Sequence, residues 1–324
     1  MNFKLVPKVE LHLHLDGSVD IKTVCDLTGK SVKEVKEEMV ASDKCSNLNE
    51  YLTKFSLAND IMQTKENIFR VTKELITKLK DDNVIYAEVR FCPLFHLKEG
   101  LTQEEVVETV ISSLKDNNIK VNLILCMMRN LSFLENKKII ELAYKYLNKG
   151  VVALDLAGSE SLYKTEDFEE LFKIAQSYNI PFTIHAGEAD GKNSILKAIS
   201  FNTKRLGHGI RCIEDMDIVK LIKDKDITLE VCPTSNIQTN IYQDYQSHPI
   251  KKLYDLGVLV TINTDNRTVS NITLTEEYQK LNKTFGFNVS DFKRMNINAI
   301  KAAFLSEIEK EKYIDIIKNY KECD

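Results

Sequence analysis

The sequence predicts a single α/β domain, residues 1–324, with the architecture of a (β/α)₈ TIM barrel. Three observations lead to this fold class. Short runs of β-branched and apolar residues alternate with longer segments whose apolar residues are spaced by three and four, which is typical of βαβ units around a parallel sheet. There are eight such runs, the number that a barrel requires. With 5 prolines and 11 glycines in 324 residues, no linker interrupts the alternation. Periodicity alone also allows a doubly wound sheet.

Each short run has the length and composition of a strand that is buried on both faces. The eight expected strands cover residues 9–15, 84–91, 121–127, 151–156, 182–185, 205–208, 228–231 and 258–263. Between them, residues 64–80, 104–116 and 137–149 carry apolar side chains on one helical face. The last of these segments is expected to end at Gly150, because glycine is a common helix stop.

Composition excludes several classes of protein. Hydrophobic residues make up 43% of the chain, which is ordinary for a globular protein and excludes a mostly disordered one. A formal net charge of −4 offers no basic surface for phosphate backbones, so no nucleic-acid partner is expected. Seven cysteines without a CxxC pair indicate reduced thiols. No signal segment and no apolar run near the ~20 residues of a membrane helix is present, so a cytoplasmic protein without a membrane partner is expected.

Two histidines lie close together in the first expected strand, ELHLHLDG. Because side chains alternate along a strand, His12 and His14 are expected to point into the barrel, while Leu11, Leu13 and Leu15 point to the surrounding helices. Burying two adjacent imidazoles costs free energy unless something binds them, and a metal ion does so well. The alternative is a pair of hydrogen-bonded core histidines.

Further polar residues follow other strands. His185 ends the fifth expected strand and Glu188 comes three residues later, His208 ends the sixth between two glycines, and Asp265 follows the eighth. Each alone has an ordinary alternative, such as a helix cap or a solvated charge. In a barrel all of them meet at the carboxyl-terminal rim, where catalytic residues collect. Three histidines and one aspartate without a nearby thiolate suit Zn²⁺ or another borderline divalent ion, Fe²⁺ and Mn²⁺ included.

A single metal ion is expected, because the fourth strand ends ALDLAGSE and offers no lysine that could bridge a second one. The remaining histidines, His96 and His248, are expected to be loop or surface residues.

Six motifs make the chain recognisable: PKVELHLHLDGS, DLAGSE, TIHAGE, LGHGIR, VCPTSN and TINTDN. Their order and spacing, from residue 7 to about residue 305, resemble the adenosine deaminase family of the amidohydrolase superfamily. The resemblance implies a hydrolase that converts adenosine and 2′-deoxyadenosine to inosine and 2′-deoxyinosine with release of ammonia, in purine salvage. The partners it implies are a small purine nucleoside and water.

The resemblance also implies roles for individual residues. One zinc ion would be held by His12, His14, His185 and Asp265. Glu188 would protonate purine N1, and His208 and Asp265 would assist the attacking water. The proposed chemistry requires Glu188 to be protonated, which burial favours because it raises the pKa of a carboxyl group.

Substrate contacts follow from the same resemblance. The backbone around Gly158 would meet purine N3, Asp16 would meet the 5′-hydroxyl, and His14 would also contact the substrate. Ser235 would orient Asp265. Asn266 stands where the best-known animal members have a second aspartate, and it would meet purine N7. N7 only accepts hydrogen bonds and an amide donates at any pH, so the change preserves the contact and resembles bacterial members.

A lid is expected before the second strand. Asn47 and Glu50 have the spacing of a capping box, and Tyr51 and Phe55 follow at helical spacing. In the family a short helix here covers the nucleoside, so Tyr51 and Phe55 are candidate substrate contacts. The alternative is that this aromatic stripe is only part of the core.

Two other functions remain open at this point. The first is the same chemistry on free adenine or on a modified or phosphorylated adenosine, although Asp16 would repel a 5′-phosphate. The second is a non-catalytic, metal-binding relative, which would typically have lost a ligand or the general acid; this chain has every one of those positions.

Overall fold

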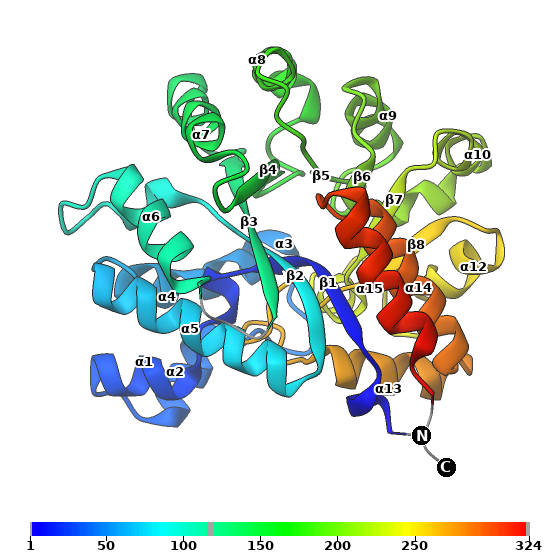
Figure 1. Cartoon of the computed structure of the whole chain (residues 1–324), viewed down its shortest axis with the longest axis horizontal. Helices are drawn as coiled ribbons and strands as arrows, with labels where there is room; N and C mark the ends of the chain where they lie inside the picture. Colours follow the sequence, from blue (N-terminus) through cyan, green and yellow to red (C-terminus); the bar gives the residue numbers. More distant parts are fainter. Residues whose placement is uncertain (1, 116–118, 322–324) are drawn as a thin grey trace.

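The computed structural model describes residues 2–115 and 119–321, and Figure 1 shows helices arranged around a ring of strands. The strands are β1 (Lys8–His14), β2 (Val84–Phe91), β3 (Lys120–Met128), β4 (Val151–Ala157), β5 (Ile184–Ala186), β6 (Arg205–His208), β7 (Thr228–Val231) and β8 (Leu259–Ile262). They form two parallel four-stranded sheets, β1-β2-β3-β4 and β5-β6-β7-β8. Parallel bridges between Leu13 and Asp265 and between Leu154 and Phe182 join the two sheets at both edges. The predicted barrel is therefore confirmed, and the doubly wound alternative is excluded.

The predicted strand boundaries agree closely with these eight strands. The bounds of β2, β6 and β7 coincide with the prediction, and most others differ by one residue. The largest difference is in β5, which begins at Ile184, whereas Phe182 forms only the bridge to Leu154. Pro181, which cannot donate a backbone hydrogen bond, precedes Phe182 and delays the regular ladder.

The first strand contains a bulge that the sequence analysis did not predict. Glu10 pairs with Ala87 and Leu13 with Val89, so Leu11 and His12 together lie opposite a single residue of β2. The amide oxygen of Asn263 accepts hydrogen bonds from the backbone nitrogens of both Leu11 and His12, at 2.9 and 3.2 Å. The bulge breaks the alternation, so the prediction that Leu11 shares a face with Leu13 and Leu15 is wrong.

The clusters of buried side chains show the same change of face. Leu13 and Leu15 belong to the main core, while Leu11 packs with Val9 and Tyr86 against residues of the last two helices. His12, the second residue of the bulge, and His14 beyond it keep the expected common orientation, with ring centroids 5.4 Å apart.

Helices connect the strands and cover the barrel from outside (Figure 1). They are α1 (Ile21–Thr28), α2 (Val32–Met39), α3 (Leu48–Leu52), α4 (Ser56–Ile61), α5 (Lys65–Asp81), α6 (Gln103–Ser113), α7 (Phe133–Tyr146), α8 (Glu169–Ser177), α9 (Lys192–Ser200), α10 (Met216–Asp224), α11 (Pro233–Gln238), α12 (Ile250–Asp255), α13 (Leu274–Phe285), α14 (Val289–Ala302) and α15 (Glu307–Asn319).

Two of the three predicted helices need correction at their ends. The prediction for 64–80 is confirmed by α5. Helix α6 ends at Ser113, and the predicted end of this segment at residue 116 lies outside the described residues. Helix α7 begins at Phe133, because Ser132 and Glu135 form a capping box, and it ends at Tyr146 rather than at Gly150, since Leu147 leaves the helical region with ψ 131°.

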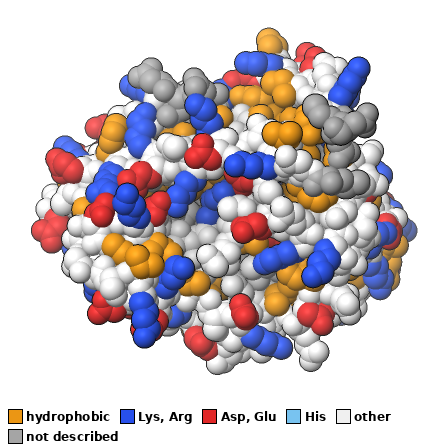
Figure 2. All heavy atoms as spheres, turned by 90° about the horizontal axis from the view of Figure 1, so that it is seen from below, with side chains coloured by type: hydrophobic (Ala, Val, Ile, Leu, Met, Phe, Trp, Pro, Cys, Tyr) orange, Lys and Arg blue, Asp and Glu red, His pale blue; other side chains and the backbone are white. Residues whose placement is uncertain are grey.

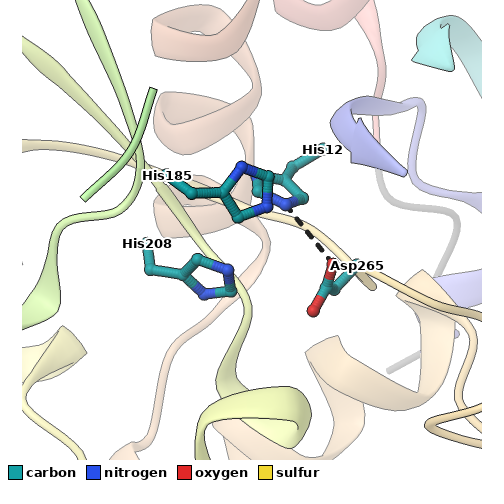
Figure 3. Close-up of side chains that lie close together, drawn as sticks. All are labelled: His12, His185, His208 and Asp265. Carbon is teal, nitrogen blue, oxygen red and sulfur yellow. Dashed lines mark ion pairs between the residues drawn. The ribbon is translucent and has the colours of Figure 1, made fainter. Parts of the chain in front are cut away.

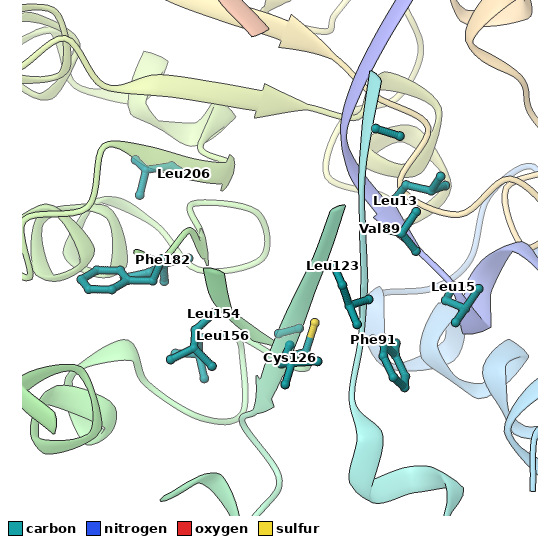
Figure 4. Close-up of a cluster of buried hydrophobic side chains, with 14 of the residues drawn as sticks. Leu13, Leu15, Val89, Phe91, Leu123, Cys126, Leu154, Leu156, Phe182 and Leu206 are labelled. Carbon is teal, nitrogen blue, oxygen red and sulfur yellow. The ribbon is translucent and has the colours of Figure 1, made fainter. Parts of the chain in front are cut away.

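The main core lies between the strands and the helices. Figure 4 shows buried side chains from several strands that meet there, among them Leu13, Val89, Leu123 and Leu154. None of these four is more than 1% exposed. A fully buried side chain of this kind contributes about 1.5–3 kcal/mol relative to exposure, so the closed ring is a rigid frame for residues at its rim.

Surface and thiol features are ordinary. On the face shown in Figure 2, the side chains of Lys and Arg are interspersed with those of Asp and Glu. The six cysteines within the described residues are all free, and Cys323 lies outside them. Within the described ranges, no helix combines the length and the apolar composition needed to cross a membrane.

Candidate active site

Four buried side chains converge where strands of the barrel end. His12 lies on β1, His185 on β5 and His208 on β6, and Asp265 follows β8. Each offers a ligand atom, and these atoms all lie within 4.8 Å of one another (Figure 3). His14 joins them from β1, because its Nε2 is 3.3 Å from His185 Nε2 and 3.4 Å from Asp265 Oδ1. The structure thus brings together all the residues expected to hold a metal, and it adds His208.

Contacts on the far sides of these groups direct their free atoms toward the centre of the cluster. His12 Nδ1 lies 2.8 Å from Glu230 Oε2, while His12 Nε2 is buried with no hydrogen-bond partner in the described structure. His185 Nδ1 lies 2.9 Å from Asp155 Oδ2. The Ser235 hydroxyl donates to Asp265 Oδ2 at 2.7 Å, as expected, so that Oδ1 faces His12 at 3.3 Å.

This donor set fits a divalent metal ion. A buried imidazole nitrogen without a partner is costly, and a metal removes that cost. Histidines whose second nitrogen contacts a carboxylate are the usual surroundings of protein-bound zinc. The pKa of Asp265 is held well below its usual range, because contacts with His12 and His14 outweigh the opposing effect of burial. Burial lowers the pKa of His14. A charged carboxylate and neutral imidazoles are the forms that bind metals.

Arg90 connects the two carboxylates that support the histidines. Its guanidinium donates to Asp155 Oδ2 and to Glu230 Oε2, both at 2.8 Å, and all three side chains are fully buried. Sequence analysis missed these residues. The available signal was a charged residue in the middle of an apolar strand, as in VRF on β2, LDL on β4 and LEV on β7.

The backbone is specialised at the same place. His208 and Asp265 adopt φ of 59° and 62°, which is uncommon for residues other than glycine and is often retained at functional sites. Gly207 lies between His185 and His12, where the close packing leaves little room for a side chain. A Cβ at Gly207 would lie 3.0 Å from His12 Cε1 and 3.2 Å from His185 Cα.

We therefore expect Gly207→Ala to weaken metal binding, because the added methyl group displaces His12 or His185. The expected loss is about 10–100-fold in metal affinity, the range typical of disturbed ligand orientation. Competition with a chromogenic chelator measures it. Gly191→Ala is the matched control, since a Cβ there meets nothing closer than 3.8 Å. Equal metal affinity of Gly207→Ala and the wild type would contradict this account of the rim.

A cavity of about 340 Å³ lies over the cluster, within the size range of small-molecule sites. Every residue expected to contact substrate lines it, namely His14, Asp16, Tyr51, Phe55, Gly158 and Asn266, together with Glu188, His208 and Asp265. No lysine or arginine is among its lining residues in the described ranges. These described lining residues therefore include no basic side chain that could pair with an anionic group.

Glu188 and His208 face each other in this cavity. Glu188 Oε2 lies 3.6 Å from His208 Nε2, and neither residue is more than 4% exposed. Burial raises the pKa of Glu188 well above its usual range, and the charges of Asp265 and Glu160 raise it further. Burial lowers the pKa of His208 well below its usual range. Both shifts favour the uncharged forms, a protonated carboxyl group beside a neutral imidazole.

A chain of hydrogen bonds assigns the proton of His208. The backbone N–H of Ile250 donates to His248 Nδ1 at 3.2 Å, so neutral His248 carries its proton on Nε2 and donates to Asn236 Oδ1 at 3.3 Å. The Asn236 amide then donates to His208 Nδ1 at 2.9 Å. Neutral His208 therefore carries its proton on Nε2, the nitrogen that faces Glu188.

The other two histidines lie in connecting segments, as expected, but the prediction that they are at the surface is wrong. His248 is 2% exposed and His96 is fully buried. His248 is buried because it hydrogen-bonds to Asn236, which lies in a different segment. His96 packs against Phe91 with ring centroids 5.5 Å apart. Burial lowers the pKa of His96 to about 4 and that of His248 to about 3.

The expected lid residues both line the cavity. Tyr51 is also buried in a small cluster with Leu48 and Val269, so the core interpretation of this side chain is confirmed, and its place in the cavity wall is where a lid residue would lie. Its hydroxyl lies 2.6 Å from Ser270 Oγ and accepts from the Asn266 amide at 3.0 Å. Asn266 Oδ1 lies against Gly17, where a Cβ would be only 1.8 Å away.

The start of helix α3 differs from the prediction. Asn47 Oδ1 accepts from the backbone nitrogens of Asn49 and Glu50, as an N-cap should. The Glu50 carboxylate, however, accepts from the backbone nitrogen of Ser46 at 2.7 Å and from its hydroxyl, not from Asn47. The expected capping box is therefore absent from this turn, because Ser46 supplies two donors where Asn47 would supply one.

Comparison with known proteins gives a consistent result. A family model described as adenosine deaminase matches residues 7–320. A curated adenosine deaminase from Clostridium botulinum (strain Okra / Type B1) is 42% identical over 333 residues, covering 99% of this chain and 98% of the relative.

Solved structures share the fold at lower identity. The N6-mAMP deaminase MAPDA of Arabidopsis superposes with a TM-score of 0.88 at 24% identity, covering 98% of this chain and 99% of that one. An amidohydrolase from Burkholderia ambifaria with bound Zn reaches a TM-score of 0.88 at 20% identity, with coverage of 98% and 93%. At these identities the two structures establish the barrel architecture alone.

Proposed function

The chain belongs to the adenosine deaminase family of metal-dependent hydrolases, and from this premise we propose that its cavity deaminates adenosine and 2′-deoxyadenosine with zinc as the metal. In this reaction a C–O bond forms at purine C6, the C–N bond to the amino group breaks, and ammonia leaves. The observation that carries the proposal is the buried Glu188, whose pKa burial raises, in the same cavity as His208 and the metal-binding cluster.

The metal is assigned to His12, His14, His185 and Asp265. A zinc ion held by these residues would lower the pKa of water from about 15.7 toward about 7 and so would supply the nucleophile. Support for zinc is the set of nitrogen and oxygen donors without a thiolate, and the bound Zn in the Burkholderia ambifaria amidohydrolase.

Glu188 acts as the acid. Because burial raises the pKa of its carboxyl group, the protonated form is favoured, and this form can donate its proton to purine N1. Protonation at N1 draws electron density from C6, and C6 then accepts the attacking oxygen. As the amine leaves and C6=O forms, the proton that remained on the C6 oxygen returns to the Glu188 carboxylate, so the product keeps N1–H and the acid is restored.

His208 and Asp265 act on the oxygen side. Neutral His208 carries its proton on Nε2 and therefore enters as a hydrogen-bond donor to the oxygen that arrives at C6. Asp265 Oδ1 is the acceptor for the proton that the water loses, while Ser235 holds Oδ2. The proton finally departs with the amine.

The remaining cavity residues orient the nucleoside. Asp16, whose pKa is raised by burial to about 7, is assigned to the 5′-hydroxyl. The backbone at Gly158 is assigned to purine N3, and the Asn266 amide, steadied by Tyr51, to N7. Phe55 and His14 form a wall, with ring centroids 6.4 Å apart. Since the described residues that line the cavity include no lysine or arginine, they offer no partner for a 5′-phosphate.

A substrate panel tests this assignment. Initial rates of the zinc-loaded protein are measured on adenosine, 2′-deoxyadenosine, adenine, AMP and N6-methyl-AMP by ultraviolet absorbance. We expect both nucleosides to react, with kcat/KM for adenine and both nucleotides lower by about 10²-fold or more, the effect of several lost or repulsive contacts. Preference for adenine or a nucleotide would overturn the substrate assignment, and inertness toward all five with zinc bound would favour a non-catalytic relative.

A further inference from the structure

Glu160 lies two residues beyond Gly158, in the DLAGSE motif, and has no role in the chemistry described above. It is 2% exposed, and its carboxylate accepts hydrogen bonds from four consecutive backbone nitrogens. Gly187 donates to Oε1 at 2.7 Å, and Glu188, Ala189 and Asp190 donate to Oε2 at 2.9, 2.8 and 3.0 Å. Ser194 donates a fifth bond through its hydroxyl. The loop that carries Glu188 is thus wrapped around one carboxylate.

Burying a carboxylate costs free energy unless its oxygens are hydrogen-bonded. No lysine or arginine of the described structure lies within ion-pair distance of Glu160, so the backbone N–H groups themselves stabilise the buried charge, as in the anion-binding concavities that successive N–H groups form. Gly187, with φ of 77°, makes the turn possible. Since two of the four donors are Glu188 and its neighbour Gly187, the backbone at Glu188 cannot move without breaking these bonds.

A second anchor holds the same region from the other side. The Arg129 guanidinium donates to the carbonyl oxygen of His185 at 2.7 Å and to Thr165 Oγ1 at 2.9 Å. Thr165 Oγ1 in turn lies 2.7 Å from Ser194 Oγ, which donates to Glu160. The end of β5 and the loop after β4 are therefore linked through buried polar contacts.

We propose that Glu160 is a positioning residue for the reaction: by binding the backbone of residues 187–190 it holds the carboxyl group of Glu188 at purine N1. The inference rests on the proposed function, since it presumes that Glu188 donates to N1. A purely structural role is the alternative, in which Glu160 only stabilises the fold. The two roles differ in what they predict for ligands that lack N1.

The test compares Glu160→Gln with the wild type. In glutamine an N–H₂ group replaces one of the accepting oxygens and faces backbone N–H donors. Hydrogen bonds to the backbone of residues 187–190 are therefore lost, while the side chain keeps its size. The binding of purine riboside, which has no amine to lose, is compared with that of its 1-deaza analogue, in which carbon replaces N1. We expect kcat for adenosine to fall by about 10²-fold, the cost of a displacement near 1 Å. We also expect the preference for purine riboside over the 1-deaza analogue to fall at least fivefold, at unchanged metal content.

Two further variants complete the design. Glu160→Asp keeps the charge but is one methylene shorter, so it should show an intermediate loss, and it decides the question if Glu160→Gln does not fold. Glu166→Gln changes an exposed carboxylate on the neighbouring turn and should behave as the wild type.

Full kcat with full N1 preference in Glu160→Gln, or in Glu160→Asp if only that folds, would overturn the proposal. Equal weakening of both ligands would do the same, because it would indicate only a structural role. Failure of the proposed function looks different, since the wild type itself would then not turn over adenosine.

Discussion

Replacing Glu188 by glutamine leaves the metal bound and lowers kcat for adenosine by about 10²–10⁴-fold, the usual contribution of a general acid. The reason lies in the surroundings of the Glu188 side chain. Glu188 is buried, burial raises the pKa of its carboxyl group, and the proton it keeps is the one assigned to purine N1. A glutamine amide has nearly the same shape but cannot transfer a proton. Steady-state kinetics together with metal analysis of the purified variant measures both halves of the prediction.

Glu214→Gln serves as the control for Glu188→Gln. Glu214 lies on the rim segment after β6, is exposed, and pairs with Arg211. It should retain wild-type kinetics. If Glu188→Gln instead keeps its turnover, or loses it only together with the metal, Glu188 is not the acid.

Removing the metal by chelation lowers turnover of adenosine by more than about 10³-fold, because the water then keeps its ordinary pKa. The protein also becomes less stable to heat. A ligand present at 100 times its Kd stabilises the folded state by about 2.7 kcal/mol, and that contribution is lost with the metal. Kinetics and thermal unfolding before chelation, after it and after return of zinc measure these changes.

Asp265→Asn should behave as a permanent form of the metal-free protein. Asp265 supplies the carboxylate oxygen that faces His12 and His14, and an amide oxygen is a weaker ligand without charge. We expect zinc to restore the chelated wild type but neither the activity nor the melting temperature of Asp265→Asn. Restoration of the variant to wild-type values would show that the metal binds elsewhere.

The barrel could be predicted because its strands are buried on both faces. Such strands appear in the sequence as continuous apolar runs, and β2, β6 and β7 were located to the residue. The bulge in β1 could not be predicted in the same way. It depends on the side chain of Asn263, which lies about 250 positions away and accepts from two successive backbone nitrogens.

Metal-binding candidates were predictable for a related reason. Barrel topology brings the ends of all strands to one rim, so residue type and position were enough to bring His12, His185 and Asp265 together. The residues that hold these metal-binding candidates in place lie on other strands of the barrel. Which carboxylate faces which histidine depends on strand tilt and register, so the contacts of Asp155, Glu230 and Arg90 required the structure.

The contacts made by loop residues were the hardest to predict from the sequence. His248, which precedes Pro249, was expected to be a loop or surface residue without a role, yet it is buried and supports Asn236 and through it His208. Glu160 belongs to a recognised motif, but four of its partners are backbone nitrogens, which carry no sequence signal.

The most direct test of the central claim is a titration of zinc into the metal-free protein, with adenosine turnover and ammonia release followed at each step. The site described here predicts that activity rises in proportion to added zinc, reaches its limit at one equivalent per chain, and yields one ammonia for each inosine formed. Full activity without metal, or a chain that binds one zinc and leaves adenosine unchanged, would contradict it.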